Sequence, residues 1–330
     1  MSRRPVCRRL IFTLAGVLAV FLAAPPAGAQ GARVYRIGVV EQGGPYGLAI
    51  EGLKEGLRES GLEERKHYAL QVIDAKGVLK VAEAAARQLE ADKVDVIFAV
   101  SSSTALAVKQ GSSRVPVVFY AGTDPVESGL VASFRKPGGR FTGVFGRQAD
   151  VTGKRLELLK AVAPKTRRVF APYNPNNTIA VKAFASAQEA AQQLKLELVE
   201  HRVPTVDELR AAVRAIKPGE VDAFFYVPDS MVTSQSDMII DTAREKRLPT
   251  MFTDTSTVAR GALASYGISF RAVGKLAAKH VQRVLKGMPP GDIPVEQMDR
   301  LYFAINLKTA KEIGLEIPQS VLTRADEVVQ

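Results

Sequence analysis

Short polar side chains collect where the apolar segments of this 330-residue chain end. Ser101, Ser102, Ser103 and Thr104 follow the apolar run at 94–100 and precede a helical pattern. Hydroxyl groups beside the free backbone N–H groups of a helix start suit a carboxylate or another anion. One such residue is enough to cap a helix, so with four in a row anion binding stands level with capping alone as an interpretation.

Carboxylate and amide side chains follow other predicted strands. Asp124, Asp229 and Asp254 each come after an apolar run, where an acid either pairs with a ligand amine or serves as an ordinary turn residue. A side-chain amide both donates and accepts hydrogen bonds, which suits a zwitterion or an amide ligand. We call the few residues that follow each predicted strand a corner. The candidate ligand-binding residues at these corners are Gly44, Tyr46, Ser102, Ser103, Thr104, Thr123, Asp124, Asn174, Asn176, Asn177, Asp229, Ser230, Thr253 and Asp254.

Residue patterns that carry catalysis are missing from the sequence. His67, His201 and His280 lie away from the predicted corners, and neither a metal-ligand spacing nor a G-x-S-x-G turn occurs. The segment GGPYG at 43–47 lacks the G-x-G-x-x-G spacing of a dinucleotide-binding loop. We therefore expect a binding protein and not an enzyme, with no catalytic residues, no metal and no cofactor. An exported α/β enzyme stays open as an alternative, and ligand turnover that is lost in Asp124→Asn would support it.

The elements that must position these corners alternate between apolar runs and helical patterns. Strands separated by ten or more helical residues form βαβ units and parallel sheets, whose carboxyl ends meet at one edge and bind ligands there. The sequence predicts an α/β fold with two similar Rossmann-like lobes. In the first lobe, strands are expected at 34–40, 68–73, 94–100 and 116–120, and helices at 49–60, 79–91 and 105–110. In the second lobe, strands are expected at 168–171, 196–202, 221–227 and 249–253, and helices at 151–162, 176–194, 206–216 and 235–246.

The boundary between the lobes is expected in the stretch 119–144, which contains the turn Pro137-Gly138-Gly139. Residues 126–134 read as a short amphipathic segment that packs the first lobe. After residue 261, extended segments alternate with turns, which indicates that the chain crosses between the lobes several times and forms a hinge. The predicted bounds are 33–143 plus 262–294 for lobe 1, and 144–261 plus 295–330 for lobe 2.

The first 29 residues have the three-part order of a secretory signal peptide. Four arginines precede an apolar run at 10–24, and Ala-Gly-Ala at 27–29 forms a small-residue cleavage signal. The apolar run is shorter than the ~20 residues that span a bilayer, which disfavours a membrane anchor. Cleavage removes Cys7, the single cysteine, and takes the formal charge from +11 to +7 because four arginines and no acids are lost. Export by the general or the twin-arginine route stays open.

Several segments resemble one known family, the ABC-transporter substrate-binding proteins that include the tryptophan/tyrosine-binding proteins. The resemblance covers nearly the whole mature chain in order. It is carried by TDPV at 123–126, GLVAS at 129–133, KPGG at 136–139, TGV at 142–144, LASYG at 263–267, PVEQ at 294–297, INLKTAK at 305–311, IP at 317–318 and RADEV at 324–328. It implies a type I periplasmic binding protein with a three-crossing hinge and no catalysis. It also implies that Ser102, Ser103, Thr104, Asn174 and Asp229 hold the ligand.

The resemblance implies the solute-binding component of an ABC importer, which closes two lobes on a small polar ligand such as an amino acid. The expected partners are that ligand and a permease in the inner membrane with its cytoplasmic ATPase, and the expected location is the periplasm. We expect a monomer that binds no nucleic acid, because Lys and Arg are scattered among Asp and Glu. The segment 42–47 departs from the family pattern, which leaves an amino acid, a urea- or amide-type solute and other polar metabolites open. A ligand-sensing partner of a membrane receptor is the alternative function.

Overall fold

Strands and helices alternate along the chain as the apolar runs predict. The structure is a computed structural model that describes residue 1 and residues 33–298 and 300–330. Residues 2–29 of the predicted signal peptide, Cys7 among them, lie outside the described residues. Within the described ranges, no helix combines the length and the apolar character that crossing a membrane requires.

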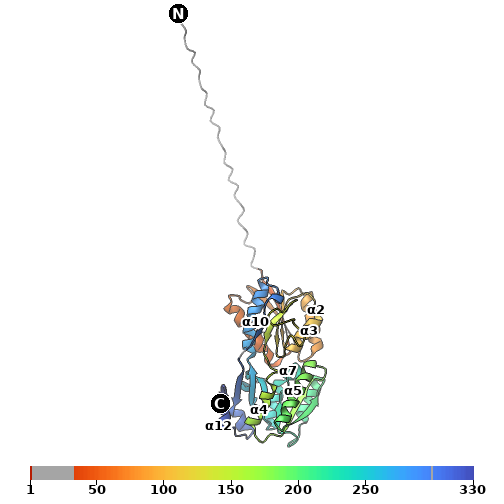
Figure 1. The fold of residues 1–330 in the computed structure, drawn as a ribbon, viewed down its shortest axis with the longest axis vertical. Helices are drawn as coiled ribbons and strands as arrows, with labels where there is room; N and C mark the ends of the chain where they lie inside the picture. The colour runs from red at the N-terminus through yellow and green to blue at the C-terminus, as the bar shows by residue number, and fades with distance from the viewer. Residues whose placement is uncertain (2–32, 299) are drawn as a thin grey trace. The chain divides into compact units, whose positions relative to one another are not determined.

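Lobe 1 is built on a six-stranded sheet with the order β11-β5-β4-β3-β1-β2, in which every pair is parallel. Its strands are β1 (Tyr35–Glu41), β2 (Tyr68–Asp74), β3 (Val96–Val100), β4 (Val117–Ala121), β5 (Phe141–Phe145) and β11 (Glu296–Gln297). Its helices are α1 (Gly47–Glu59), α2 (Leu79–Ala91), α3 (Ser102–Gly111) and α10 (Phe270–Leu285), with short 3-10 turns η1 (Gly44–Tyr46) and η2 (Pro290–Asp292). Figure 1 shows α2, α3 and α10 together in this lobe.

Both faces of this first sheet are covered by helices, which explains why its central strands are apolar throughout. In β3, Phe98 and Val100 pack in the core under α1 and α10, whereas Ile97 and Ala99 pack in the core under α2 and α3. Every residue of β3 is buried.

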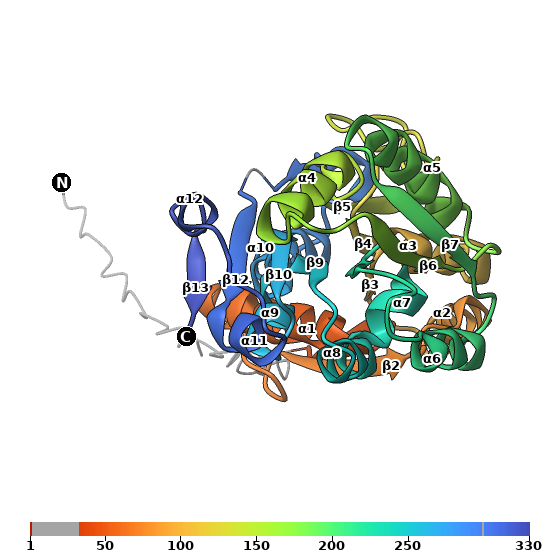
Figure 2. The ribbon, with the colours of Figure 1, turned by 90° about the horizontal axis from the view of Figure 1, so that it is seen from below.

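Lobe 2 is built on a seven-stranded sheet with the order β13-β12-β10-β9-β8-β6-β7. Figure 2 shows β13, β12, β10 and β9 of this sheet in that order from left to right. Its strands are β6 (Arg168–Tyr173), β7 (Glu197–Arg202), β8 (Ala223–Phe225), β9 (Thr250–Asp254), β10 (Ala264–Ile268), β12 (Tyr302–Asn306) and β13 (Glu327–Val329). Its helices are α4 (Thr152–Val162), α5 (Thr178–Gln193), α6 (Val206–Ala215), α7 (Ser230–Ser234), α8 (Ser236–Glu245), α9 (Thr255–Ala259), α11 (Leu307–Glu312) and α12 (Gln319–Leu322). The prediction of parallel sheets needs one correction, because β10 and β12 are antiparallel.

The chain passes between the two sheets three times, which confirms the predicted two-lobed α/β fold with a three-crossing hinge. The crossings lie between β5 and α4, between β10 and α10, and between β11 and β12. The predicted boundaries between the lobes differ from these crossings by a few residues. Strand β10 belongs to the second sheet, since Ala264 pairs with Met251 of β9, and β11 belongs to the first, since Glu296 pairs with Val144. Each crossing therefore falls a few residues later than the predicted boundaries at 143, 261 and 294.

The segment at 126–134, predicted to be amphipathic, has no regular secondary structure and begins with turns at 126–129. Leu130 and Val131 are nevertheless buried in the core of lobe 1, so the apolar side chains of this segment pack as expected.

Helix α10 joins lobe 1 by packing against α1 at backbone distance. A Cβ atom added at Gly52 would lie 2.0 Å from the carbonyl oxygen of Arg271, and one added at Gly274 would lie 1.9 Å from that of Ala49. Contacts between non-bonded heavy atoms have their optimum near ~3.5–4.0 Å, so only glycine fits at these two positions. This close approach anchors a late segment of the chain to an early helix.

Candidate ligand-binding site

An inner cavity of about 40 Å³ lies where the carboxyl ends of both sheets face each other. Open α/β sheets bind ligands at this edge. Lobe 1 contributes to its lining Tyr46, Ser101, Ser102, Ser103, Tyr120, Gly122, Thr123 and Phe270, and lobe 2 contributes Ile179, Tyr226, Pro228, Asp229, Ser230 and Thr253. Gln148, from the first crossing, completes the lining.

The lobe 1 wall is organised by the serines at the start of α3. The Ser101 hydroxyl accepts a hydrogen bond from the Thr104 backbone N–H at 3.1 Å and so caps the helix. The Ser102 hydroxyl accepts from the backbone N–H groups of Gly122 and Thr123, at 3.0 and 3.1 Å. These bonds tie the corner after β3 to the corner after β4. Unlike the Thr104 N–H, the backbone N–H groups of Ser102 and Ser103 have no acceptor within the helix, as at every helix start, and they suit an anionic group.

Ser101 holds an unusual backbone conformation for a residue other than glycine, with φ of 120°. Strained residues of this kind concentrate at binding and catalytic sites, where the surrounding structure holds them in place. The capping bond to Thr104 and the hydrogen bond from the Ser101 N–H to the Tyr120 carbonyl, 3.2 Å long, supply that support.

The lobe 2 wall is organised by Asp229, which is 2% exposed. Its carboxylate accepts from the backbone N–H groups of Met231 and Asn174, at 2.7 and 2.8 Å, and caps the short helix α7. Burial raises the pKa of Asp229 to about 6, although the backbone hydrogen bonds oppose that shift. The group is therefore a buried carboxylate at neutral pH, and it suits the amine of a ligand.

One hydrogen bond connects the two walls directly. The Ser103 hydroxyl, on lobe 1, donates to Asn177 Oδ1, on lobe 2, over 3.1 Å. Asn177 also caps α5 by accepting from the Ile179 N–H, while its buried Nδ2 has no partner of good hydrogen-bond geometry. Its amide also helps to lower the pKa of Asp229. The predicted Ser/Thr and Asn corners thus meet across the cleft.

Aromatic rings form the apolar part of the cavity. Tyr46 and Phe270 pack with ring centroids 4.8 Å apart, and Tyr120 meets Phe270 edge-on at 5.7 Å. Tyr226 lines the lobe 2 side, where burial raises its pKa to about 12. Sequence reasoning found Tyr46 alone among these rings. Tyr120 ends the predicted strand at 116–120 and Tyr226 lies near the end of the one at 221–227, so an aromatic side chain near a strand end was the usable signal for these two. Phe270 begins α10 and gave no such signal.

The first crossing supplies two further polar residues that sequence reasoning missed. Gln148 Nε2 donates to the Thr253 carbonyl at 3.1 Å, and Gln148 Oε1 accepts from Arg155 at 3.0 Å. Arg155, on α4, is fully buried. Burial lowers the pKa of its guanidinium to about 10, which leaves it positively charged at neutral pH.

Several predicted site residues lie near the cavity without lining it. Thr104 bonds Gln42 Nε2 at 2.8 Å inside lobe 1. Asp254 caps α9 and accepts from the Phe270 N–H at 3.2 Å, which ties the end of β9 in lobe 2 to the start of α10 in lobe 1. Gly44 lies against α7, where a Cβ would be 2.6 Å from the Thr233 carbonyl oxygen.

The remaining predicted residues line grooves that continue outward from the cavity. Asn174 and Asn176 face a groove of about 690 Å³ beside α2 and α6. Asp124 lines another groove of about 690 Å³ and accepts from the Val126 N–H at 2.7 Å, as an ordinary turn residue does. Thr123 reaches both this groove and the inner cavity.

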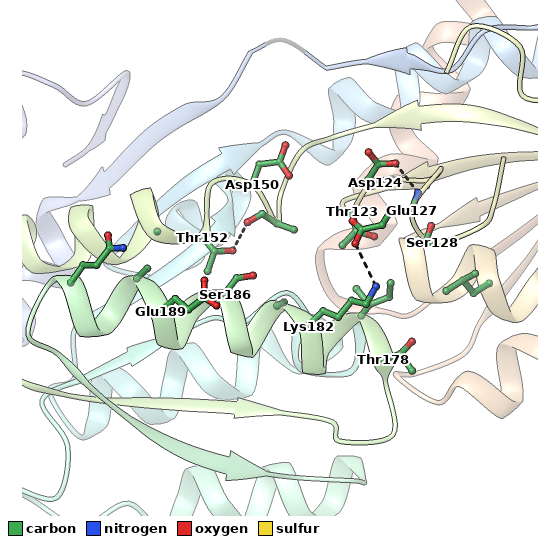
Figure 3. Close-up of a pocket in the computed structure, with 17 residues that line it drawn as sticks. Thr123, Asp124, Glu127, Ser128, Asp150, Thr152, Thr178, Lys182, Ser186 and Glu189 are labelled. Atoms are coloured by element: carbon green, nitrogen blue, oxygen red, sulfur yellow. Dashed lines mark hydrogen bonds and ion pairs between the residues drawn. The ribbon is translucent and has the colours of Figure 1, made fainter. Parts of the chain in front are cut away.

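Figure 3 shows this second groove, in which a row of side chains on α5 faces the loop at 123–128. Lys182 of α5 pairs with Glu127 of lobe 1 at 3.6 Å, although both side chains are mostly exposed. The groove is larger than the inner cavity, but it lies beside α5 and the turns and not among the strand ends. Of these three cavities among the described residues, the inner cavity combines buried charge, helix starts and aromatic rings from both lobes.

Ionisable side chains in the described ranges form no group of three or more His, Cys, Asp or Glu residues suited to a metal ion. The three histidines lie away from the cavity lining. His280 is buried between the carbonyl oxygens of Leu276 and Pro294, and His201 stacks on Phe170.

A family model and several known proteins match this chain. The model for ABC transporter substrate binding proteins matches residues 37–329. A tyrosine-binding protein of Clostridioides difficile (strain R20291) is 28% identical over 268 residues, which cover 81% of this chain and 77% of that protein.

Solved structures show the same architecture. A conserved domain protein from Vibrio cholerae superposes with a TM-score of 0.80 at 27% identity, and the match covers 90% of this chain and all of that one. An ABC domain from Streptococcus pneumoniae, in complex with L-Trp, superposes with a TM-score of 0.78 at 26% identity over the same shares of the two chains.

Proposed function

The chain belongs to the ABC transporter substrate-binding protein family, and on this premise we propose that it binds an amino acid or a closely related small metabolite between its lobes. The observation that carries the proposal is the composition of the inner cavity. Asp229 offers a buried carboxylate for an amine, the start of α3 offers N–H groups for a carboxylate, and Tyr46, Tyr120, Tyr226 and Phe270 offer an aromatic wall.

The relatives support a ligand with an aromatic side chain. The Clostridioides difficile relative is named for tyrosine, and the Streptococcus pneumoniae structure contains L-Trp. In this chain, four aromatic rings around one small cavity are consistent with such a side chain, because ring pairs gain about 0.5–1.5 kcal/mol beyond the area they bury. We propose L-tyrosine and L-tryptophan as the first ligands to test.

Binding and lobe closure are coupled in this proposal. A ligand that contacts both lobes favours the closed state by its difference in affinity for the two states. The bond from Ser103 to Asn177 and the pair of Lys182 with Glu127 join the lobes only when these are together. Closure then presents both lobes to a permease in the inner membrane that works with a cytoplasmic ATPase.

We further propose that the mature protein acts as a periplasmic monomer, binds no nucleic acid and releases its ligand unchanged. Cleavage after residue 29 would start the mature chain at Gln30. Mass spectrometry of the protein recovered from the periplasmic fraction tests the export and the cleavage. A chain that keeps its first 29 residues would contradict the cleavage.

Isothermal titration of the purified protein against the L-amino acids is the direct test of function. The protein is first unfolded and refolded so that it carries no ligand from the cell. We expect one amino acid to bind with micromolar affinity or better, and X-ray scattering to show a smaller radius of gyration with it than without it. Binding of no amino acid, or binding without closure, would count against the proposal.

A further inference from the structure

A fully buried arginine without an acidic partner lies behind the cavity wall. Arg155 makes no ion pair with a carboxylate among the described residues, and its Nε has no hydrogen-bond partner. Its terminal nitrogens donate to Gln148 Oε1, to the Gln148 carbonyl at 2.7 Å and to the Thr152 hydroxyl at 3.0 Å. Buried charges in proteins are normally paired, because an unpaired charge in a low-dielectric interior is costly. The positive charge of Arg155 therefore calls for a partner that the described residues do not supply.

Arg155 also fixes the orientation of Gln148. A guanidinium donates hydrogen bonds and accepts none, so the group facing it must be the Gln148 oxygen and not the amide nitrogen. The amide nitrogen then points to the other side, where it donates to the carbonyl oxygen of Thr253. The same nitrogen lies near the Tyr120 hydroxyl, whose raised pKa it helps to lower. Gln148 is thereby held as a donor at the cavity wall.

This donor lies next to the start of α3. Gly122, whose N–H bonds the Ser102 hydroxyl, is close enough that a Cβ there would lie 3.2 Å from the Gln148 Cβ. The N–H groups at the helix start and the Gln148 amide thus line the same part of the cavity, with the Arg155 charge behind them. Every one of these groups favours an anionic or hydrogen-bond-accepting group of the ligand.

We propose that Gln148, oriented by Arg155, determines specificity for a ligand carboxylate, and that Arg155 supplies the balancing charge from behind. The proposal rests on the proposed function. It adds that recognition of the carboxylate depends on the hinge crossing and not on lobe 1 alone, whereas the ligand amine is recognised by Asp229 of lobe 2.

The test compares three related compounds on wild-type protein and on Gln148→Met, which has a similar length and no donor. L-Tyrosine carries both charges, tyramine lacks the carboxylate, and 3-(4-hydroxyphenyl)propionate lacks the amine. Gln148→Met should reduce the preference for tyrosine over tyramine by about tenfold, as expected for a lost hydrogen bond to a charged group. The preference for tyrosine over the propionate should stay unchanged. Arg147→Met, which removes an exposed arginine from the same crossing, is the matched control and should change neither preference.

A loss of both preferences together, or a loss of the amine preference alone, would overturn the assignment. Wild-type protein that binds none of the three compounds would contradict the proposed function for tyrosine. The role of Arg155 is then still decided without any ligand, by crystal structures of Arg155→Met and Arg155→Lys.

In Arg155→Met we expect the Gln148 side chain to leave the Thr253 carbonyl, because nothing holds its oxygen on the far side. In Arg155→Lys the Gln148 amide should again donate to the Thr253 carbonyl, since an ammonium group, like a guanidinium, only donates and therefore faces the Gln148 oxygen. A Gln148 side chain that keeps its bond to Thr253 in Arg155→Met would reject Arg155 as the positioning residue. If Arg155→Met does not fold, Arg155→Lys still decides the point, because displacement of Gln148 in that variant would also reject the proposal.

Discussion

At the scale of single residues, Asp229 combines two tasks in one side chain. Its carboxylate caps α7 through the Met231 N–H, and it also lines the inner cavity. An asparagine would keep the cap through its oxygen, because Asn and Asp are equally good N-cap residues, but it would remove the negative charge. Its amide nitrogen would also face the Asn174 N–H, from which it cannot accept. A second buried aspartate that loses a comparable bond is therefore needed to separate the structural task from the binding task.

We expect Asp229→Asn to weaken binding of an amino acid by about 1–3 kcal/mol, and to lower the melting temperature about as much as Asp254→Asn does, because each variant loses one acceptor oxygen for a backbone N–H. Asp254→Asn is the matched control, because Asp254 is equally buried and caps α9 but does not line the cavity. Titration calorimetry and thermal unfolding of both variants give the answer. Equal affinity in Asp229→Asn and wild type would remove Asp229 from the ligand contacts.

At the scale of elements, α7 packs closely against lobe 1 at Gly44. This glycine has φ of +60°, and a Cβ there would meet the Thr233 carbonyl oxygen of α7 at 2.6 Å. Both the backbone conformation and the contact thus favour glycine. Gly61 has a similar conformation, with φ of +80°, but open space around it, so it isolates the effect of the contact.

Gly44→Ala and Gly61→Ala should lower the melting temperature to a similar extent, because both place a side chain at positive φ. Only Gly44→Ala should also weaken ligand binding, by about tenfold, since α7 must shift by a few tenths of an ångström before the lobes can close. Titration of both variants with the ligand found for wild type checks this. Wild-type affinity in Gly44→Ala would show that α7 does not limit closure.

The close packing of α1 on α10 leads to a second prediction at the scale of elements. Gly52→Ala should lower the free energy of unfolding by about 1–3 kcal/mol, because the added methyl group collides with the Arg271 carbonyl oxygen. Gly47→Ala, in the same helix but with no atom near its Cβ, should be neutral or slightly stabilising. Urea unfolding of the two variants measures the difference, and equal stabilities would mean that the helices do not touch at Gly52.

At the scale of the whole molecule, buried acids link stability to pH. Burial raises the pKa of Asp229 and of Asp254 to about 6 and that of Glu41 to about 7. A carboxyl group with a higher pKa in the folded than in the unfolded state contributes most to stability when protonated, below the unfolded value. That contribution is lost as the pH rises through the folded pKa.

We therefore expect these three groups to lower the free energy of unfolding between about pH 4 and pH 7. Asp254→Asn, which cannot ionise, should flatten this dependence by an amount on the order of 2 kcal/mol. Urea unfolding of wild type and Asp254→Asn at several pH values tests the prediction. Curves that stay parallel across the range would contradict it.

Local patterns were enough to predict most elements of this fold. Helix α2 lies at the predicted residues, Leu79–Ala91, and the strand ends do bring Ser103 and Asn177 together. The exact positions of the three crossings could not be predicted from local sequence patterns. Whether β10 or β11 joins one sheet or the other depends on pairing with strands far away in the chain, which leaves no local mark.

The site was predicted in part for a related reason. Residues after strands were identified because parallel topology gathers them at one edge. Gln148 lies in a crossing, so that rule did not reach it. Arg155 did leave a signal, because it shares the buried face of α4 with Leu158 and Leu159, three and four residues further on. A charged residue on an apolar helix face indicates an unusual partner.

The three crossings also determine when each lobe can be completed during synthesis. Lobe 1 takes α10 and β11 from residues 270–297, and lobe 2 takes β12 and β13 from residues 302–329. Chains emerge from the ribosome with their N-terminus first, and elements that depend on distant partners wait for those partners. A chain stalled before residue 270 therefore lacks the helix that covers one face of the first sheet. Such a fragment leaves the cores of both lobes unfinished, so neither lobe is complete until the chain has passed its last crossing.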